Sequence, residues 1–152
     1  MIFPYIRHRV DASSAIPAGE IARPEIPLRI ISKNDSVEIT GLLDTGADHV
    51  FLSVLLAELL GIELDENMAE SAEGAGGNEL KIWPGEVELE IAQAGEVHRW
   101  LTHVGFIDGG VDPAAAYLGQ AGFLEHFVAT FDYGEQTVEL LPKRSVIGQS
   151  VE

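Results

Sequence analysis

The sequence has 152 residues, 46% of them hydrophobic, which suits one compact domain with a substantial core and leaves little room for a second. Its formal net charge is −16, and it contains no cysteine. An acidic body repels nucleic acid and anionic lipid. The lack of cysteine excludes a disulfide scaffold, a thiolate zinc site and a cysteine nucleophile, so a reducing, cytoplasmic location fits best.

The charge is unevenly distributed. Up to Lys33, five basic residues stand against three acids, which gives +2 and leaves −18 for the remainder. The basic segment could contact the acidic body of its own or of a neighbouring chain. The longest apolar stretch, residues 50–62, is interrupted by Ser53 and Glu58 and is too short to span a bilayer. The opening "MIFPYIRHRV" offers no signal-peptide core, so we expect a soluble protein without a membrane partner.

Residues 1–24 show little periodicity and contain Pro4, Pro17, Gly19 and Pro24. This composition predicts an irregular N-terminal arm. A single domain is expected over residues 25–142, followed by a C-terminal tail at 143–152.

The domain is expected to begin with a hairpin. "EIPLRIIS" and "VEITGLLD" are β-branched runs separated by the turn-forming residues 33–36, so the second strand delivers Asp44. Ser53 can then cap a short helix over "VLLAELLG", which Gly61 terminates.

The next segment, "SAEGAGGNELKI", concentrates glycines between a polar run and a strand beginning near Leu80. Because glycine has no Cβ, such a tip is mobile and lets backbone approach a ligand closely. "VELEIA" alternates strictly, and Gly95 turns it into a second strand, "EVHRWLTHVGFI". "AAAYLGQAGFLEHF" runs from a strand end through Gly119 into a helix-like segment, and two strands around Gly134 close a mostly β chain.

Asp44 stands where a core residue would be expected, directly after two leucines. A carboxylate at the end of an apolar strand loses hydration, which makes its charged form costly unless hydrogen bonds or a shared proton compensate. Either the strand ends at a solvated turn, or this acid has a chemical role.

Over about residues 25–141 the sequence resembles the retropepsin-like aspartic proteases. "LLDTGAD" matches their active-site motif, "EGAGGNE" resembles their flap, and "YLGQAGFLEHF" is similar to the segment that supports the active-site strand. "SVLLAELLGI" and the final "VATFDYGEQTVELLP" resemble the bacterial members in particular. The resemblance implies a mostly β, retropepsin-like acid protease half-barrel with a flap hairpin and one or two short helices.

The resemblance also implies an aspartic endopeptidase that needs no cofactor. The other sites where glycine closely follows an aspartate, at Asp108 and Asp132, lack a threonine or serine after the aspartate, so the second catalytic acid is expected from a second chain of a homodimer. A peptide or protein substrate would lie between the two chains. The resemblance implies three catalytic residues, Asp44, Thr45 and Gly46. It implies as substrate-binding residues Ala47, Asp48, Gly74, Ala75, Gly76 and Gly77.

Within this set, Thr45 corresponds to a residue whose hydroxyl bonds across the dimer axis. Asp48 corresponds to a residue that holds substrate main chain and, in viral members, pairs with an arginine after the conserved glycine. Here that position is Gln120, which can hydrogen-bond a carboxylate but cannot neutralise it. His49 is expected to face water.

Other interpretations use the same residues. The main alternative is a catalytically silent module of the same fold that only binds peptide or dimerises, and a bare Asp-Thr-Gly can also be an ordinary turn. His98 and His103, with Asp108, could suggest a metal site, but their five-residue spacing in a strand places the rings on opposite faces, so no metal is expected. The glycine run lacks the Lys-Ser/Thr of a phosphate loop. Both tryptophans, Trp83 and Trp100, are expected in the core.

Overall fold

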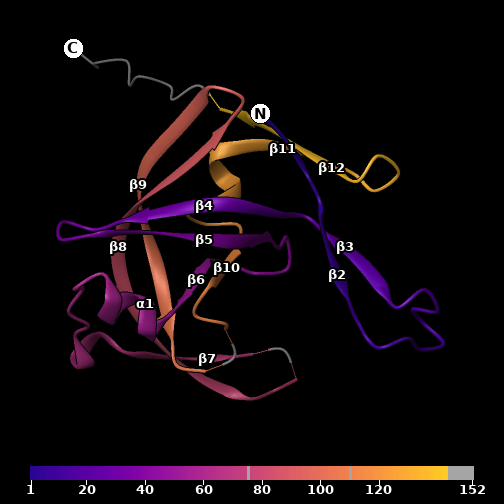
Figure 1. Cartoon of the computed structure of the whole chain (residues 1–152). Helices are drawn as coiled ribbons and strands as arrows, with labels where there is room; N and C mark the ends of the chain where they lie inside the picture. Colours follow the sequence, from indigo (N-terminus) through magenta and orange to yellow (C-terminus); the bar gives the residue numbers. More distant parts are fainter. Residues whose placement is uncertain (75, 110, 144–152) are drawn as a thin grey trace, which may run out of the picture.

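The computed structural model describes residues 1–74, 76–109 and 111–143 (Figure 1). Over these residues the strands form a seven-stranded sheet, a three-stranded sheet and a two-stranded hairpin. In spatial order, the seven-stranded sheet consists of β4 (Glu25–Ile31), β5 (Ser36–Leu43), β10 (Ala115–Leu118), β6 (Val50–Ser53), β9 (Glu96–Ile107), β8 (Glu79–Gln93) and β7 (Glu70–Glu73). Because β4 also pairs with β8, the sheet closes on itself and encloses the core, with β7 outside the closed part.

The expected first hairpin is present as β4 and β5. The two strands are antiparallel, with Leu28 opposite Ile39. Alternate residues of β4 are buried, so this face packs into the core. The connecting turn is held locally, since the hydroxyl oxygen of Ser32 accepts hydrogen bonds from the backbone amides of Asn34 and Asp35.

The long hairpin of β8 and β9 also follows the sequence pattern. Val87, Leu89 and Ile91 are buried on one face of β8. The connecting residues Ala94 and Gly95 both have positive φ, 50° and 84°, which suits a two-residue turn between twisted strands. These two strands form the long, curved pair that runs the height of the molecule in Figure 1.

The helices are short. Helix α1 (Val54–Leu59) begins at Ser53, whose hydroxyl oxygen accepts a hydrogen bond from the amide of Leu55, and the chain leaves it at Gly61, where φ is 65°. Both expected ends of this helix are therefore confirmed. The helix-like segment "GFLEHF" contains only the single 3₁₀ turn η2 (Leu124–His126), and a second turn, η1 (Glu66–Met68), precedes β7.

The expectation of an irregular N-terminal arm was wrong. Strand β1 (Ile2–Pro4) pairs with β12 (Thr137–Pro142), which in turn pairs with β11 (Phe127–Asp132). Strands β2 (Ile6–Arg9) and β3 (Glu20–Arg23) form the separate hairpin. Met1 and Phe3 are buried, so this segment is part of the folded body. Of the expected C-terminal tail, residues 144–152 lie outside the described residues.

The tryptophans differ in their burial. Trp83 belongs to the core, as expected. Trp100 is half-buried against the core, and its indole N–H donates to the carbonyl of Gly122 at 2.8 Å. Among the helices of the described residues, none has the length and apolar character needed to cross a membrane.

Candidate active site

Asp44 follows the last residue of β5 directly. Leu43 is buried, whereas Asp44 is only half-buried, so strand alternation turns its carboxylate away from the core. Its backbone amide donates to the carbonyl of Leu118 on β10 at 3.1 Å. The acid is therefore fixed by two strands that pair in parallel, β5 and β10, and not by a free loop.

A tight turn after Asp44 fixes the orientation of the carboxylate. Its Oδ1 atom accepts a hydrogen bond from the amide of Gly46 at 2.8 Å, and the amide of Ala47 bonds to the carbonyl of Asp44 at 3.2 Å. A Cβ at position 46 would lie 3.2 Å from Oδ1, which explains why glycine suits this position. No described residue donates to Oδ2, so this oxygen is open to a proton, a water or a second acid.

The loop over residues 44–49 is locked to a second turn, formed by Gly119, Gln120 and Ala121. The amide of Gln120 donates to the carbonyl of Ala47, and the amide of Ala121 donates to the carbonyl of Asp48, both at 2.9 Å. Gly119 lies so close to this loop that a Cβ there would meet its backbone carbonyl groups. The two segments, more than seventy positions apart in sequence, therefore form one rigid unit around Asp44.

The Gln120 side chain does not hydrogen-bond the Asp48 carboxylate. Its side-chain amide instead donates to the carbonyl oxygen of Thr45 at 2.8 Å. The amide thus holds the backbone of the 44–49 loop, and not the carboxylate of Asp48. Asp48 and Thr45 are both exposed, and so is His49, which confirms that His49 faces solvent.

The glycine-rich segment forms the tip of the β7–β8 hairpin. The amide of Gly74 donates to the carbonyl of Asn78 at 2.8 Å, and that of Gly77 donates to the carbonyl of Gly74 at 3.0 Å. Gly76 and Gly77 have φ of 97° and 80°, a region that disfavours other residues. Ala75, which was predicted to contact substrate, lies outside the described residues.

The histidines considered as metal ligands lie apart. His98 packs against the rings of Trp100 and Phe127, whereas His103 is exposed beside Glu86 on the other face of β9. Their expected placement on opposite faces is confirmed. Among the described residues, no group of three or more His, Cys, Asp or Glu side chains is arranged to hold a metal ion.

Several residues that line a cavity near Asp44 were not predicted from the sequence. Leu42 and Tyr117 lie opposite each other in the β5–β10 register and line a cavity. The signal for Leu42 was present, because residues two apart in a strand share a face and Leu42 precedes Asp44 by two. Arg23 and His8 line the same cavity, and no local pattern in residues 1–24 pointed to them.

The fold and the candidate site together are of the aspartic-protease type. A strand end carries one open carboxylate, a glycine-containing turn cradles it, and a Gly-Gln-Ala turn braces it. Residues 26–120, more than half of the chain, match the family model described as aspartyl protease, and the chain belongs to that family. With its mostly β architecture, this confirms the expected retropepsin-like fold.

Two solved structures are similar to this chain at low identity. A retropepsin-like aspartic protease from Rickettsia conorii is 19% identical, with a TM-score of 0.47, over 92% of this chain and 91% of that one. The retroviral protease-like domain of Ddi1 from Leishmania major is 18% identical, with a TM-score of 0.46, over 83% of this chain and 99% of that one. No curated protein matches the sequence. The family match, and not these likenesses, carries the assignment.

Proposed function

We propose that the protein is a homodimeric aspartic endopeptidase, in which Asp44 of each chain supplies one of two catalytic carboxylates. The observation that carries this proposal is the placement of Asp44, whose Oδ1 is held by the amide of Gly46 while Oδ2 is left open, at the end of a strand in an aspartyl protease fold. A carboxylate held rigidly in this way suits catalysis, because reacting groups must be held in one geometry.

The chemistry needs two such acids close together. Two adjacent carboxylates cannot both ionise readily, so they share one proton. The ionised member takes a proton from a water, whose oxygen attacks the peptide carbonyl carbon, while the protonated member donates a hydrogen bond to the carbonyl oxygen. Collapse of the tetrahedral intermediate breaks the C–N bond, and a proton passes from the acids to the leaving amine. One chain supplies a single suitable acid, so a two-fold dimer completes the pair.

The remaining site residues would act around this pair. The exposed Thr45 would brace the two loops across the dimer axis, and Asp48 would hold substrate main chain. The glycine-rich tip, with Gly74, Gly76 and Gly77, would close over the bound peptide as a flap, since glycine backbone can approach a ligand closely.

The test is digestion of a peptide library by the wild-type chain and by Asp44→Asn, over a range of pH values and with sedimentation run in parallel. We expect Asp44→Asn to fold and dimerise but to lose cleavage, because the amide preserves the shape of the carboxyl group and cannot cycle its proton. Asp108→Asn is the matched control. It also removes the acid of an Asp-Gly pair, but from an exposed position outside the proposed site, and should cleave like wild type.

The outcomes separate the two candidate functions. Cleavage by Asp44→Asn within about tenfold of wild type would contradict the proposed mechanism. A wild-type chain that binds peptides or dimerises without cleaving any of them would instead support the silent module.

A further inference from the structure

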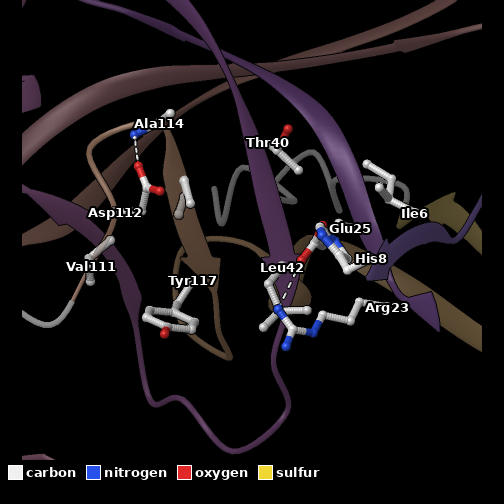
Figure 2. A pocket seen from close by; sticks show the side chains of 12 residues that line it. Ile6, His8, Arg23, Glu25, Thr40, Leu42, Val111, Asp112, Ala114 and Tyr117 are labelled. Carbon is white, nitrogen blue, oxygen red and sulfur yellow. Dashed lines mark hydrogen bonds and ion pairs between the residues drawn. The ribbon is translucent and has the colours of Figure 1, made fainter. Parts of the chain in front are cut away.

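A cavity of about 460 Å³ lies between the N-terminal hairpin and the sheet that carries Asp44, and its lining includes Leu42, two residues before Asp44 (Figure 2). Its inner wall is built from Thr40 and Leu42 of β5 and from Ala115, Ala116 and Tyr117 of β10. Thr40, Leu42, Ala115 and Tyr117 are half-buried and share one face of the sheet, since they alternate with the buried residues 41, 43, 116 and 118. Asp44 continues the series of Thr40 and Leu42, so its carboxylate lies on the face that the cavity occupies.

The outer wall of the cavity comes from a part of the chain that the family match does not include. Ile6, His8, Arg23 and Glu25 line the cavity, and all four precede residue 26, where the match begins. Ile6 and His8 belong to β2, Arg23 belongs to β3, and Glu25 is the first residue of β4.

The two ends of the cavity carry opposite charge. Figure 2 shows Arg23 below Leu42 at one side and Asp112 at the other. The amide of Leu43 donates to the carbonyl of Pro24 at 3.0 Å, so Arg23 lies beside the end of β5, where Asp44 follows. Asp112 precedes β10, which runs parallel to β5, and therefore lies at the end remote from Asp44.

The charged groups at the Arg23 end are not equally available to a ligand. The Glu25 side chain is only 11% exposed, and its carboxylate pairs with His8 at 2.6 Å and with Arg23 at 3.9 Å. Arg23 is 45% exposed, and no described residue accepts a hydrogen bond from it. Glu25 is thus engaged, whereas the guanidinium has donors open toward the cavity. The sequence up to Lys33 also has a positive balance, +2, against −18 for the remainder.

We propose that this cavity is a substrate subsite that selects an acidic side chain, glutamate above all, next to the scissile bond, with Arg23 as the selecting residue. The methylene groups of the glutamate would lie between Leu42 and Tyr117, and its carboxylate would accept hydrogen bonds from Arg23, away from Asp112. This inference rests on the proposed function for the scissile bond, but the binding preference itself does not require turnover.

The test uses a peptide series in which each position in turn carries Glu, Gln, Leu or Lys, with cleavage sites identified by mass spectrometry. We expect kcat/KM to be about fivefold higher for Glu than for Leu or Lys at one position flanking the cut, a modest factor because Arg23 keeps solvent contact. Arg23→Gln should abolish the advantage of Glu over Gln. Arg7→Gln is the matched control, since Arg7 belongs to the same hairpin but pairs with Glu20 and does not line the cavity.

Binding of the same peptides to Asp44→Asn, followed by fluorescence anisotropy, provides an arm without catalysis. Tighter binding of the Glu peptide that is lost in Asp44→Asn/Arg23→Gln would support the subsite. If wild type cleaves nothing, the endopeptidase proposal fails, and this arm alone decides the subsite. If peptides are cleaved without a Glu preference, or Arg23→Gln retains it, the subsite is wrong while the protease stands. A preference for Lys that disappears in Asp112→Asn would also overturn it.

Discussion

Gly119→Ala is the substitution whose effect the structure defines most sharply. A methyl group at this position would lie 2.9 Å from the carbonyl carbon of Ala47, and closer still to the carbonyl oxygens of Ala47 and His49. All three atoms are backbone, so no rotamer change relieves the overlap. Since apolar contacts are comfortable at about 3.5 to 4.0 Å, the 44–49 loop must move by about 1 Å.

The energetic cost follows from what the movement breaks. Two hydrogen bonds, each 2.9 Å long, join this loop to Gln120 and Ala121 and would be strained or lost. At about 1 kcal/mol per hydrogen bond, with about 1 to 3 kcal/mol for overpacking, the free energy of unfolding should fall by about 3 to 5 kcal/mol. Peptide cleavage should fall too, because the displaced loop carries Asp44.

The assay is urea unfolding followed by tryptophan fluorescence at one fixed chain concentration, because dimerisation makes apparent stability depend on concentration. Gly134→Ala is the control, since its added methyl group would meet only a side-chain oxygen of Asp132, at 3.3 Å. That variant should change the free energy of unfolding by less than about 1 kcal/mol. A similarly small effect for Gly119→Ala would refute the interlocked arrangement.

Four further outcomes are expected. Thr45→Ala should weaken dimerisation by about 1 to 3 kcal/mol in sedimentation, through loss of its cross-axis hydroxyl, and an unchanged dissociation constant would refute that role. Glu66→Ala should raise hydrogen exchange at the base of the β7–β8 hairpin, because the Glu66 carboxylate binds Lys81 at 2.6 Å and the Trp83 indole at 3.2 Å; unaltered exchange would contradict this role. The Lys81 hydrogen bond lowers the pKa of Glu66, so the stability that Glu66 contributes is present above the ordinary glutamate pKa and is lost as pH falls through the folded value. Burial, with a smaller effect from the charge of His126, lowers the pKa of His98, so wild type should lose stability as pH falls from about 6.5 through that lowered value. In His98→Gln, stability measured by acid and thermal unfolding should depend less on pH over this range. Two chains of −16 give a dimer of −32, so association measured by sedimentation should strengthen with added salt at neutral pH, and cleavage should peak below neutrality; a dimer insensitive to salt would contradict the role of charge.

Much of the fold could be predicted because its signals are local. The hairpin of β4 and β5, the Ser53 cap and the turn at Gly95 each depend on residues a few positions apart. The same holds for Asp44, whose place at a strand end follows from the leucines before it. Local pattern thus identified the strand that carries the site.

The missed features depend on distant partners. Ile2 of β1 pairs with Glu139, so no pattern within residues 1–24 could show that this segment joins a sheet. Strand β7 has the sequence ESAE, which carries no strand pattern of its own, so only the resemblance to the family predicted a hairpin here. Gln120 could bond a carboxylate or a carbonyl with equal chemistry, and only the packing of Gly119 against the 44–49 loop directs its amide to Thr45. The cavity wall formed by Arg23 has the same long-range origin.

The most direct measurement of the central claim, one Asp44 from each of two chains, is a mixing experiment. Wild-type and Asp44→Asn chains are combined in varying ratio at constant total concentration, allowed to exchange, and assayed for peptide cleavage. If both acids are required, activity follows the square of the wild-type fraction, and an equal mixture retains about a quarter of the wild-type rate. An equal mixture that retains about half, with activity linear in the wild-type fraction, would show that each chain works alone and would contradict the two-chain active site.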